Sequence, residues 1–183
     1  MIITISGTPG AGKGTIGKLL AKKLKYKYYS MGDLRGKMAL ERGMTIDELN
    51  KLGEKESFTD KDVDDYQRKL GQTEDNIIVD GRLSWFCIPT SVKIFVKCER
   101  TVGAERIFKA PRRPDEPQYE SVDDVFARVN ERIASDTKRY KKYYGVDYLD
   151  EKNYDFIINT TTLTPEASLD KVLDFLKARG VKA

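Results

Sequence analysis

The 183-residue chain is 39% hydrophobic and 34% charged, and its formal net charge is +4. This length suits one compact domain, and so large an apolar fraction excludes a disordered chain. The sequence has no histidine and only two cysteines, Cys87 and Cys98, which argues against a zinc site and removes serine–histidine and cysteine–histidine chemistry. We expect two reduced thiols, and the mild positive charge suits an anionic partner such as phosphate or nucleic acid.

The sequence shows no sign of membrane association or export. No apolar run approaches the roughly 20 residues of a membrane-spanning helix. The first residues, Met1–Ile5, lack the charged and apolar segments of a secretory signal peptide. We therefore expect a cytoplasmic protein that has no membrane partner. We also expect a monomer.

Short β-branched runs alternate with segments of helical periodicity along the chain. In chain order, strands are expected at residues 2–5, 26–30, 76–80, 92–96 and 154–158. Helices are expected at residues 16–24, 33–42 and 121–144, with further helices capped by Thr45, Thr59 and Thr164. This alternation predicts an α/β fold of three layers, in which a five-stranded parallel sheet is covered by helices on both faces.

A glycine-rich loop, Gly7-Thr8-Pro9-Gly10-Ala11-Gly12-Lys13-Gly14-Thr15, joins the first expected strand to the first expected helix. Glycines let successive N–H groups point inward around an anion, and the helix N-terminus adds partial positive charge. Lys13 adds a cation for the outer phosphates. The loop therefore predicts a phosphate-binding loop, or P-loop, and a P-loop NTPase-type fold. Its expected nucleotide-binding residues are Gly7, Pro9, Gly10, Ala11, Gly12, Lys13, Gly14 and Thr15.

Asp80 ends the third expected strand, and Gly81 and Arg82 follow directly. A carboxylate at this edge of a parallel sheet is placed to hold magnesium through water, and a neighbouring guanidinium is placed to bind an acceptor phosphate. The alternative is an ordinary turn at the end of a strand.

The long expected helix at residues 121–144 carries a charged trio, Arg132, Asp136 and Arg139. Their i, i+4, i+7 spacing places them on one face, beside an apolar stripe. Two arginines with a carboxylate can bind phosphate together with hydroxyl or base groups. The alternative is a solvated row of ion pairs.

Residues 109–118 contain three prolines and two adjacent arginines, which indicates a mobile loop inside the single domain 1–183. Phosphoryl transfer depends on in-line positioning and charge stabilisation more than on a general base. Arg106, Arg112 and Arg113 lie in or beside this loop, so we expect a lid at about residues 106–120 that closes over the phosphates and excludes water. The alternative is an exposed basic loop.

The loop pattern G-x-P-G-x-G-K-G-T resembles the P-loop of adenylate kinases and their nucleoside monophosphate kinase relatives, which use Mg-ATP. Asp80-Gly81-Arg82 and the strand Val92–Val96 resemble bacterial cytidylate kinases. Residues 32–35, 41–44 and 139–147 resemble the archaeal cytidylate kinases. The resemblance spans nearly the whole chain and is weakest from residue 48 to residue 73.

The resemblance implies a kinase that moves the γ-phosphoryl of ATP onto CMP or dCMP, with Mg²⁺ as cofactor and acceptor-binding helices at about residues 32–73. The implied catalytic residues are Lys13, Arg82, Arg106, Arg112 and Arg113. The implied acceptor-binding residues are Asp33, Arg35, Asp80, Arg82, Arg132, Asp136 and Arg139. Thr15 and, through water, Asp80 are the implied metal-binding residues. One departure is Gly36, where the family often has arginine; Arg35 precedes it, about 100° around a helix.

Three alternative functions stay open at this point. An adenylate kinase, with AMP as acceptor, would have an equally close P-loop. A P-loop switch would bind nucleotide without an acceptor. An RNA-binding module would use the basic and aromatic runs at residues 22–29 and 139–144.

Overall fold

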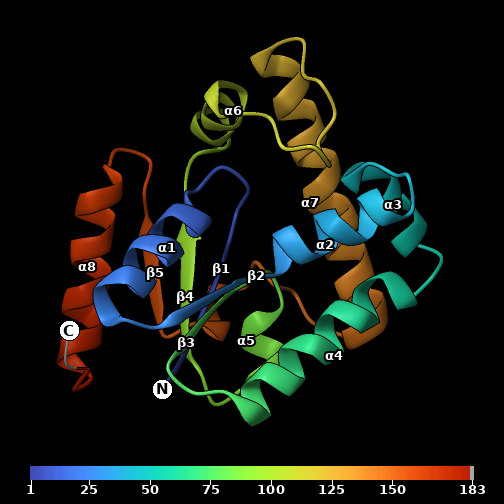
Figure 1. Ribbon diagram of the computed structural model, residues 1–183. Coiled ribbons are helices and arrows are strands. Elements are labelled where there is room, and N and C mark those ends of the chain that lie inside the picture. Colours follow the sequence, from blue (N-terminus) through green and yellow to red (C-terminus); the bar gives the residue numbers. More distant parts are fainter. Residues whose placement is uncertain (182–183) are drawn as a thin grey trace.

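The computed structural model describes residues 1–181, so the last two residues of the expected domain lie outside the described part (Figure 1). Five strands form one parallel sheet in the order β2-β3-β1-β4-β5. They are β1 (Ile2–Gly7), β2 (Lys27–Ser30), β3 (Ile77–Asp80), β4 (Val92–Lys97) and β5 (Phe156–Asn159). The predicted five-stranded parallel sheet is therefore confirmed.

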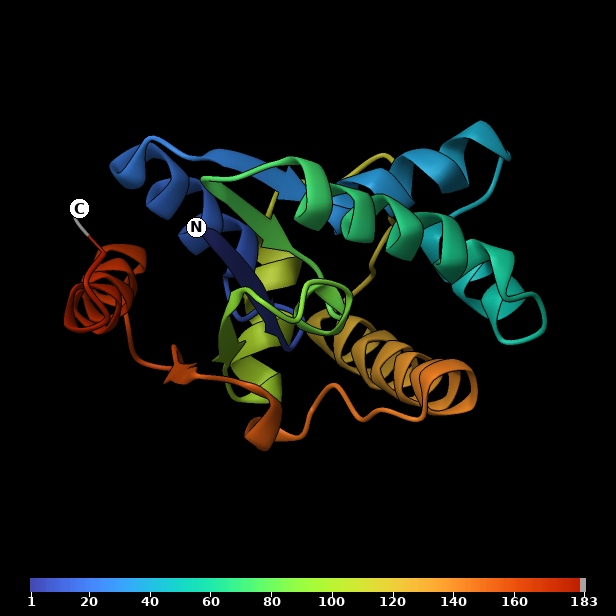
Figure 2. The same ribbon diagram turned by 90° about the horizontal axis from the view of Figure 1, so that it is seen from below.

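Helices cover both faces of the sheet. They are α1 (Lys13–Leu24), α2 (Met31–Glu41), α3 (Ile46–Gly53), α4 (Phe58–Thr73), α5 (Ser84–Cys87), α6 (Arg100–Lys109), α7 (Val122–Tyr144) and α8 (Pro165–Ala178), with a 3₁₀ turn at Glu151–Asn153. Seen from below, α8 and α7 lie on opposite sides of the sheet (Figure 2). The arrangement is the predicted three-layer α/β fold.

Side chains of the central strand β1 alternate between the two faces of the sheet, which explains why a core lies on each face. Ile3 and Ile5 are fully buried and pack with α1 and α8 against one face. Thr4 and Ser6 point the other way, because successive strand residues face opposite sides of a sheet. Ser6 Oγ donates a 2.7 Å hydrogen bond to the Gly81 carbonyl, which ties β1 to the turn after β3. The second face is covered by α4, α5 and α7.

Helices α2, α3 and α4 form a separate group that packs against α7 (Figure 1). Thr45 caps α3 as predicted, because its hydroxyl accepts from the Glu48 N–H and the Glu48 carboxylate accepts from the Thr45 N–H. The cap predicted at Thr59 is wrong. Thr59 lies inside α4, whose N-cap is Ser57, and its hydroxyl donates to the Glu56 carbonyl instead.

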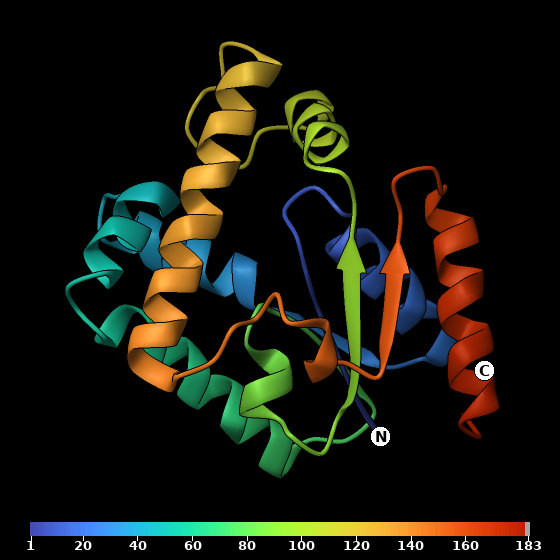
Figure 3. The same ribbon diagram turned by 180° about the vertical axis from the view of Figure 1, so that it is seen from behind.

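The expected lid segment begins as a helix. Residues 106–109 are the last turn of α6, a helix that the sequence reading missed, and residues 110–120 contain turns but no helix or strand. From behind, α6 and the upper part of α7 stand side by side above β4 (Figure 3). Cys87 and Cys98 are free thiols, as expected. Among residues 1–181, no helix combines the length and the apolar character needed to cross a membrane.

Candidate functional site

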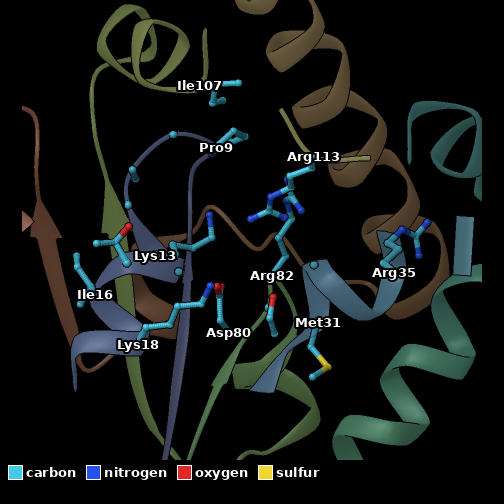
Figure 4. A pocket seen from close by; sticks show the side chains of 18 of the residues that line it. Pro9, Lys13, Ile16, Lys18, Met31, Arg35, Asp80, Arg82, Ile107 and Arg113 are labelled. Carbon is cyan, nitrogen blue, oxygen red and sulfur yellow. The ribbon is translucent and has the colours of Figure 1, made fainter. Parts of the chain in front are cut away.

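A cavity of about 790 Å³ lies at the carboxyl ends of the strands (Figure 4). Its lining includes the P-loop after β1, Ser30 at the end of β2, Asp80 at the end of β3 and Thr160 after β5. Parallel strands bring these ends to one edge of the sheet, which is where ligands bind in open α/β folds. One end of the cavity is the P-loop, and the other is bounded by α2, α4 and α7.

Two glycines let the P-loop pack closely on its neighbours. Gly7 has φ +147°, and a side chain there would place its Cβ 1.9 Å from the Val96 carbonyl oxygen. Gly10 has φ +72°, and a Cβ there would lie 2.3 Å from the Gly103 carbonyl oxygen of α6. Only glycine fits both the backbone angle and the space. The P-loop is thereby held between β4 and α6, with α1 beginning at Lys13.

Lys13 points its ammonium group into the cavity (Figure 4) and donates a 3.0 Å hydrogen bond to the Thr8 carbonyl oxygen. Burial lowers the pKa of Lys13 to about 8, although Asp80 opposes this shift. An ammonium at the N-terminus of α1 is arranged to receive an anion.

Asp80 lies next to the first turn of α1. Its Oδ2 accepts a 2.9 Å hydrogen bond from the Tyr28 hydroxyl, and a Cβ on Gly14 would lie 3.6 Å from the same oxygen. Burial raises the pKa of the Asp80 carboxyl above its ordinary value, against the opposing effect of Lys13. The structure thus brings Asp80 to the P-loop, as the sequence predicted.

The donor set fits a magnesium ion that is held mainly by a nucleotide. Within residues 1–181 there is no group of three or more acidic or cysteine side chains that could form a metal cage. The Thr15 hydroxyl and the Asp80 carboxylate line the same cavity. Magnesium keeps several waters and takes one or two protein oxygens together with substrate phosphates, so two such residues suffice.

Three arginines line the far end of the cavity: Arg35, Arg82 and Arg132. Burial lowers the pKa of Arg132, and the positive charge of Arg82 lowers it further. Three side-chain N–H groups there, Arg35 Nη2, Arg82 Nε and Arg132 Nε, are buried without a hydrogen-bond partner. Buried donors normally have partners, so a cluster of positive, unpaired donors at a cavity suits an anionic ligand.

The other two members of the charged trio on α7 lie beneath this site. Asp136 and Arg139 are each 1% exposed and do not line the cavity. Asp136 Oδ1 accepts a 2.6 Å hydrogen bond from Arg139 Nη2. Asp136 Oδ2 lies 2.6 Å from Arg82 Nε, but off the hydrogen-bond direction, so we treat this pair as a charge contact.

The structure gives the three members of the trio different surroundings. The expectation of one buried face is right, and Arg132 reaches the cavity. Asp136 and Arg139 contact protein groups instead: Asp136 supports Arg82, and Arg139 Nε donates a 2.9 Å hydrogen bond to Asp60 of α4. Burial alone would raise the pKa of Asp136, but Arg82 and Arg139 outweigh it and hold this pKa below its ordinary value.

The Arg35 guanidinium is anchored by hydrogen bonds to protein groups, unlike that of a free phosphate-binding side chain. It donates hydrogen bonds to the Thr59 carbonyl oxygen at 2.6 Å and to Asp60 Oδ1 at 2.9 Å. A Cβ on the neighbouring Gly36 would lie 2.6 Å from Asp115 Oδ2. An arginine at this position would therefore displace the Asp115 carboxylate.

Two of the three predicted lid arginines reach the cavity. Arg106 lines it but is held by a 2.7 Å hydrogen bond to the Thr160 carbonyl oxygen. Arg113 lines it near Arg82 (Figure 4) and lies 3.3 Å from Asp33, which is exposed and outside the cavity lining. Arg112 is exposed and does not line the cavity.

The sequence reading missed four cavity-lining residues of α4: Asp60, Val63, Asp64 and Gln67. They lie where the resemblance to known kinases is weakest. The three polar residues among them, Asp60, Asp64 and Gln67, have the same i, i+4, i+7 spacing as the trio on α7. This spacing could have identified them in the sequence. Four lining residues at the donor end of the cavity were likewise not predicted from the sequence: Thr160, Leu163, Pro165 and Ser168.

Comparisons with known proteins point to one family. A model of the cytidylate kinase-like family matches residues 2–162. The cytidylate kinase of Methanocella arvoryzae is 37% identical over 161 residues, covering 88% of each chain. That of Halobacterium salinarum is 36% identical over 180 residues, covering 97% of this chain and 90% of its own.

Among solved structures, shikimate kinase from Bacteroides thetaiotaomicron superposes with a TM-score of 0.67 at 17% identity, covering 97% of this chain and 98% of its own. Identity this low supports the fold alone. The P-loop kinase fold and the match of a single family over most of the sequence lead to one assignment. The chain belongs to the cytidylate kinase-like family.

Proposed function

We propose that this protein is a nucleoside monophosphate kinase that transfers the γ-phosphoryl group of ATP to CMP or dCMP. The observation that carries the proposal is one cavity with cationic side chains at both ends, Lys13 of the P-loop at one and Arg82 with Arg132 at the other. A nucleotide switch needs only the first end. A second anion site facing the P-loop fits an acceptor whose phosphate must meet the ATP γ-phosphate.

Residues at the two ends of the cavity have different roles. The P-loop N–H groups and Lys13 bind the outer phosphates of ATP, while Arg82 and Arg132 bind and orient the acceptor phosphate. Positive charge at the second end favours the ionised acceptor phosphate, which is then the nucleophile without a general base. When bound, magnesium neutralises charge on the β- and γ-phosphates, and Thr15 and, through water, Asp80 would hold it.

At the donor end, Arg106 and Thr160 form one wall of the cavity together with Leu163 and Pro165. A flat guanidinium fixed by a carbonyl oxygen, next to apolar side chains, suits stacking on an adenine ring. We therefore place the ATP base there. This position makes Arg106 a binding residue for ATP more than a charge-stabilising residue of the lid.

Family membership favours CMP over AMP as acceptor. Relatives that align with almost all of this chain are cytidylate kinases, among them those of Methanocella arvoryzae and Halobacterium salinarum. The adenylate kinase alternative depended on the P-loop alone, and that loop lies at the donor end.

The test is an ATP-coupled assay against CMP, dCMP, UMP, AMP and GMP in parallel. We expect CMP and dCMP to give the highest kcat/KM, with product identified as the nucleoside diphosphate. Phosphorylation of AMP at least as efficient as that of CMP would overturn the acceptor assignment. Slow ATP hydrolysis with no phosphorylated acceptor would overturn the kinase assignment and support a switch.

A further inference from the structure

The acceptor end of the cavity contains a second polar group, apart from the arginines. Asp64 and Gln67 of α4 line the cavity while being only 4% and 2% exposed. Ser84 of α5 and Tyr144 of α7 support them from outside. Burying so many polar side chains costs free energy unless each has a partner, so the arrangement of their donors and acceptors is informative.

The amide of Gln67 has a fixed direction. Its Nε2 donates a 3.0 Å hydrogen bond to Asp64 Oδ1, and its Oε1 accepts a 2.5 Å hydrogen bond from Ser84 Oγ. An ionised carboxylate only accepts hydrogen bonds, so the NH₂ side of the amide must face Asp64. Ser84 follows Asp80-Gly81-Arg82 by two residues, which ties this group to the turn that also carries the acceptor arginine.

Asp64 retains unused capacity to accept hydrogen bonds. Oδ1 accepts from Gln67 and Oδ2 accepts from the Tyr144 hydroxyl. The Cys87 thiol also donates to Asp64. A carboxylate offers about four acceptor positions, so about one stays available to a ligand in the cavity. Apolar side chains of Met31, Val63 and Leu83 line the same region and suit the faces of a flat base.

We infer that Asp64, oriented by Gln67 and Tyr144, reads the exocyclic amino group of the acceptor base and thereby selects cytosine over uracil. The inference rests on the proposed function. The cytosine amino group donates a hydrogen bond to the carboxylate. Uracil presents a carbonyl oxygen at the same position, which would leave two acceptors facing each other, and unpaired buried groups discriminate strongly between ligands.

The first test compares kcat/KM for CMP and UMP in the wild type and in Asp64→Asn. We expect the CMP/UMP ratio to fall by on the order of 10-fold or more, with KM for ATP nearly unchanged. Asp62→Asn is the matched control, because Asp62 is an exposed residue of the same helix, and its ratio should equal that of the wild type. An unchanged ratio in a folded Asp64→Asn protein would overturn the inference.

The second test is the pH dependence of the same ratio in the wild type, which needs no variant to fold. Burial raises the pKa of Asp64 to about 6, against the opposing hydrogen bond from Tyr144. The titratable and charged groups that face Asp64 are Asp60 and Arg68 of α4, Cys87 of α5 and Tyr144 of α7. The ratio should be constant at higher pH and fall as pH falls through about 6, because protonated Asp64 can donate to a carbonyl oxygen.

Two features make this pH test specific. The second ionisation of a nucleotide phosphate also lies near pH 6, but CMP and UMP share it, so it cancels in the ratio. Tyr144→Phe removes the hydrogen bond that lowers the pKa of Asp64, so its midpoint should move to higher pH. A residue with only a structural role would not move that midpoint, and a ratio independent of pH would overturn the inference.

The outcomes separate this inference from the proposed function. If the wild type phosphorylates neither CMP nor UMP, or prefers AMP, the proposed function fails. If the wild type prefers CMP to UMP and neither Asp64→Asn nor low pH changes the ratio, only the role of Asp64 is rejected.

Discussion

Lys13 combines a buried ammonium group with a neighbouring carboxylate, Asp80. Burial lowers its pKa to about 8, so the free enzyme begins to lose this charge in mildly alkaline solution. Bound phosphates need the protonated form. Since kcat/KM reports the ionisations of the free enzyme, we expect kcat/KM for ATP to fall as pH rises above about 8. A pH profile that stays flat to about pH 10 would contradict this assignment of the titrating group.

Replacing Lys13 by alanine removes the cation that accompanies the transferred phosphoryl group. We expect Lys13→Ala to lose on the order of 10²- to 10³-fold in kcat, the usual cost of removing one charge-stabilising group. Its thermal unfolding should stay close to that of the wild type. Lys22→Ala, an exposed change on the same helix at a residue outside the cavity lining, serves as the control. Near-normal kcat in a folded Lys13→Ala protein would rule out this role for the P-loop.

Asp136 acts through its neighbours. It is ion-paired with Arg82 and Arg139, and removing one partner of a buried charge group typically costs about 3–5 kcal/mol of stability. We expect Asp136→Ala to lower the free energy of unfolding by this amount and to raise KM for CMP, because Arg82 loses its support. KM for ATP should change little. Asp123→Ala, exposed on the same helix, should do neither. Weaker ATP binding with unchanged KM for CMP would place α7 on the donor side.

At the scale of elements, the segment that follows α6, residues 110–120, places two adjacent arginines differently relative to the cavity. Arg113 lines the cavity and contacts Asp33, whereas Arg112 is exposed and outside it. A charge-stabilising arginine can be worth on the order of 10³-fold in kcat. We therefore expect a large loss of kcat in Arg113→Ala and a small one in Arg112→Ala. Equal losses would show that the loop rearranges on closure to bring in both.

The same segment should close when both nucleotides are present. Residues 110–120 have no helix or strand of their own, so their amide hydrogens exchange readily in the free protein. We expect hydrogen exchange there to slow with ATP and CMP together, more than with either alone. Equal exchange in all samples would argue against a lid.

Helix capping gives a stability test that is independent of activity. Thr45 makes a complete capping box with Glu48, and replacing such a cap by alanine costs about 1 kcal/mol. We expect Thr45→Ala to lower the free energy of unfolding by that amount. Ser57→Ala is the matched control, because Ser57 is the N-cap residue of α4 but makes no capping hydrogen bond. A similar loss in both variants would refute the argument.

At the scale of the whole molecule, features that depend on local sequence pattern could be predicted. The distance of each side chain from the cavity could not. Apolar β-branched runs and the glycine-rich loop identified the strands, the P-loop and the parallel sheet. Helix α6 was missed because only Gly103 and Ala104 in it are buried, which leaves almost no apolar periodicity. Spacing placed the trio on one face of α7, but it carries no information on how far each side chain lies from a cavity.

The polar residues of α4 illustrate the same limit. Asp60, Asp64 and Gln67 have the spacing of an ordinary solvated helix face, and their burial depends on helices α5 and α7, which are distant in sequence. Only the tertiary fold makes them part of a site. Gly36 is a similar case: its lack of a side chain is explained by Asp115, a residue far along the chain.

That contact has a further consequence. Asp115 rests against Gly36 of α2 and its carbonyl oxygen accepts a 2.9 Å hydrogen bond from the Ile46 N–H, while the same chain segment begins in α6, which packs on the P-loop at Gly10. One continuous stretch of chain therefore touches the helices of the acceptor end and the loop of the donor end. We expect a movement of α2 around the acceptor to shift α6, so that binding of one nucleotide changes the affinity for the other. Linkage of this kind is reciprocal: the factor by which CMP changes the dissociation constant of ATP equals the factor by which ATP changes that of CMP.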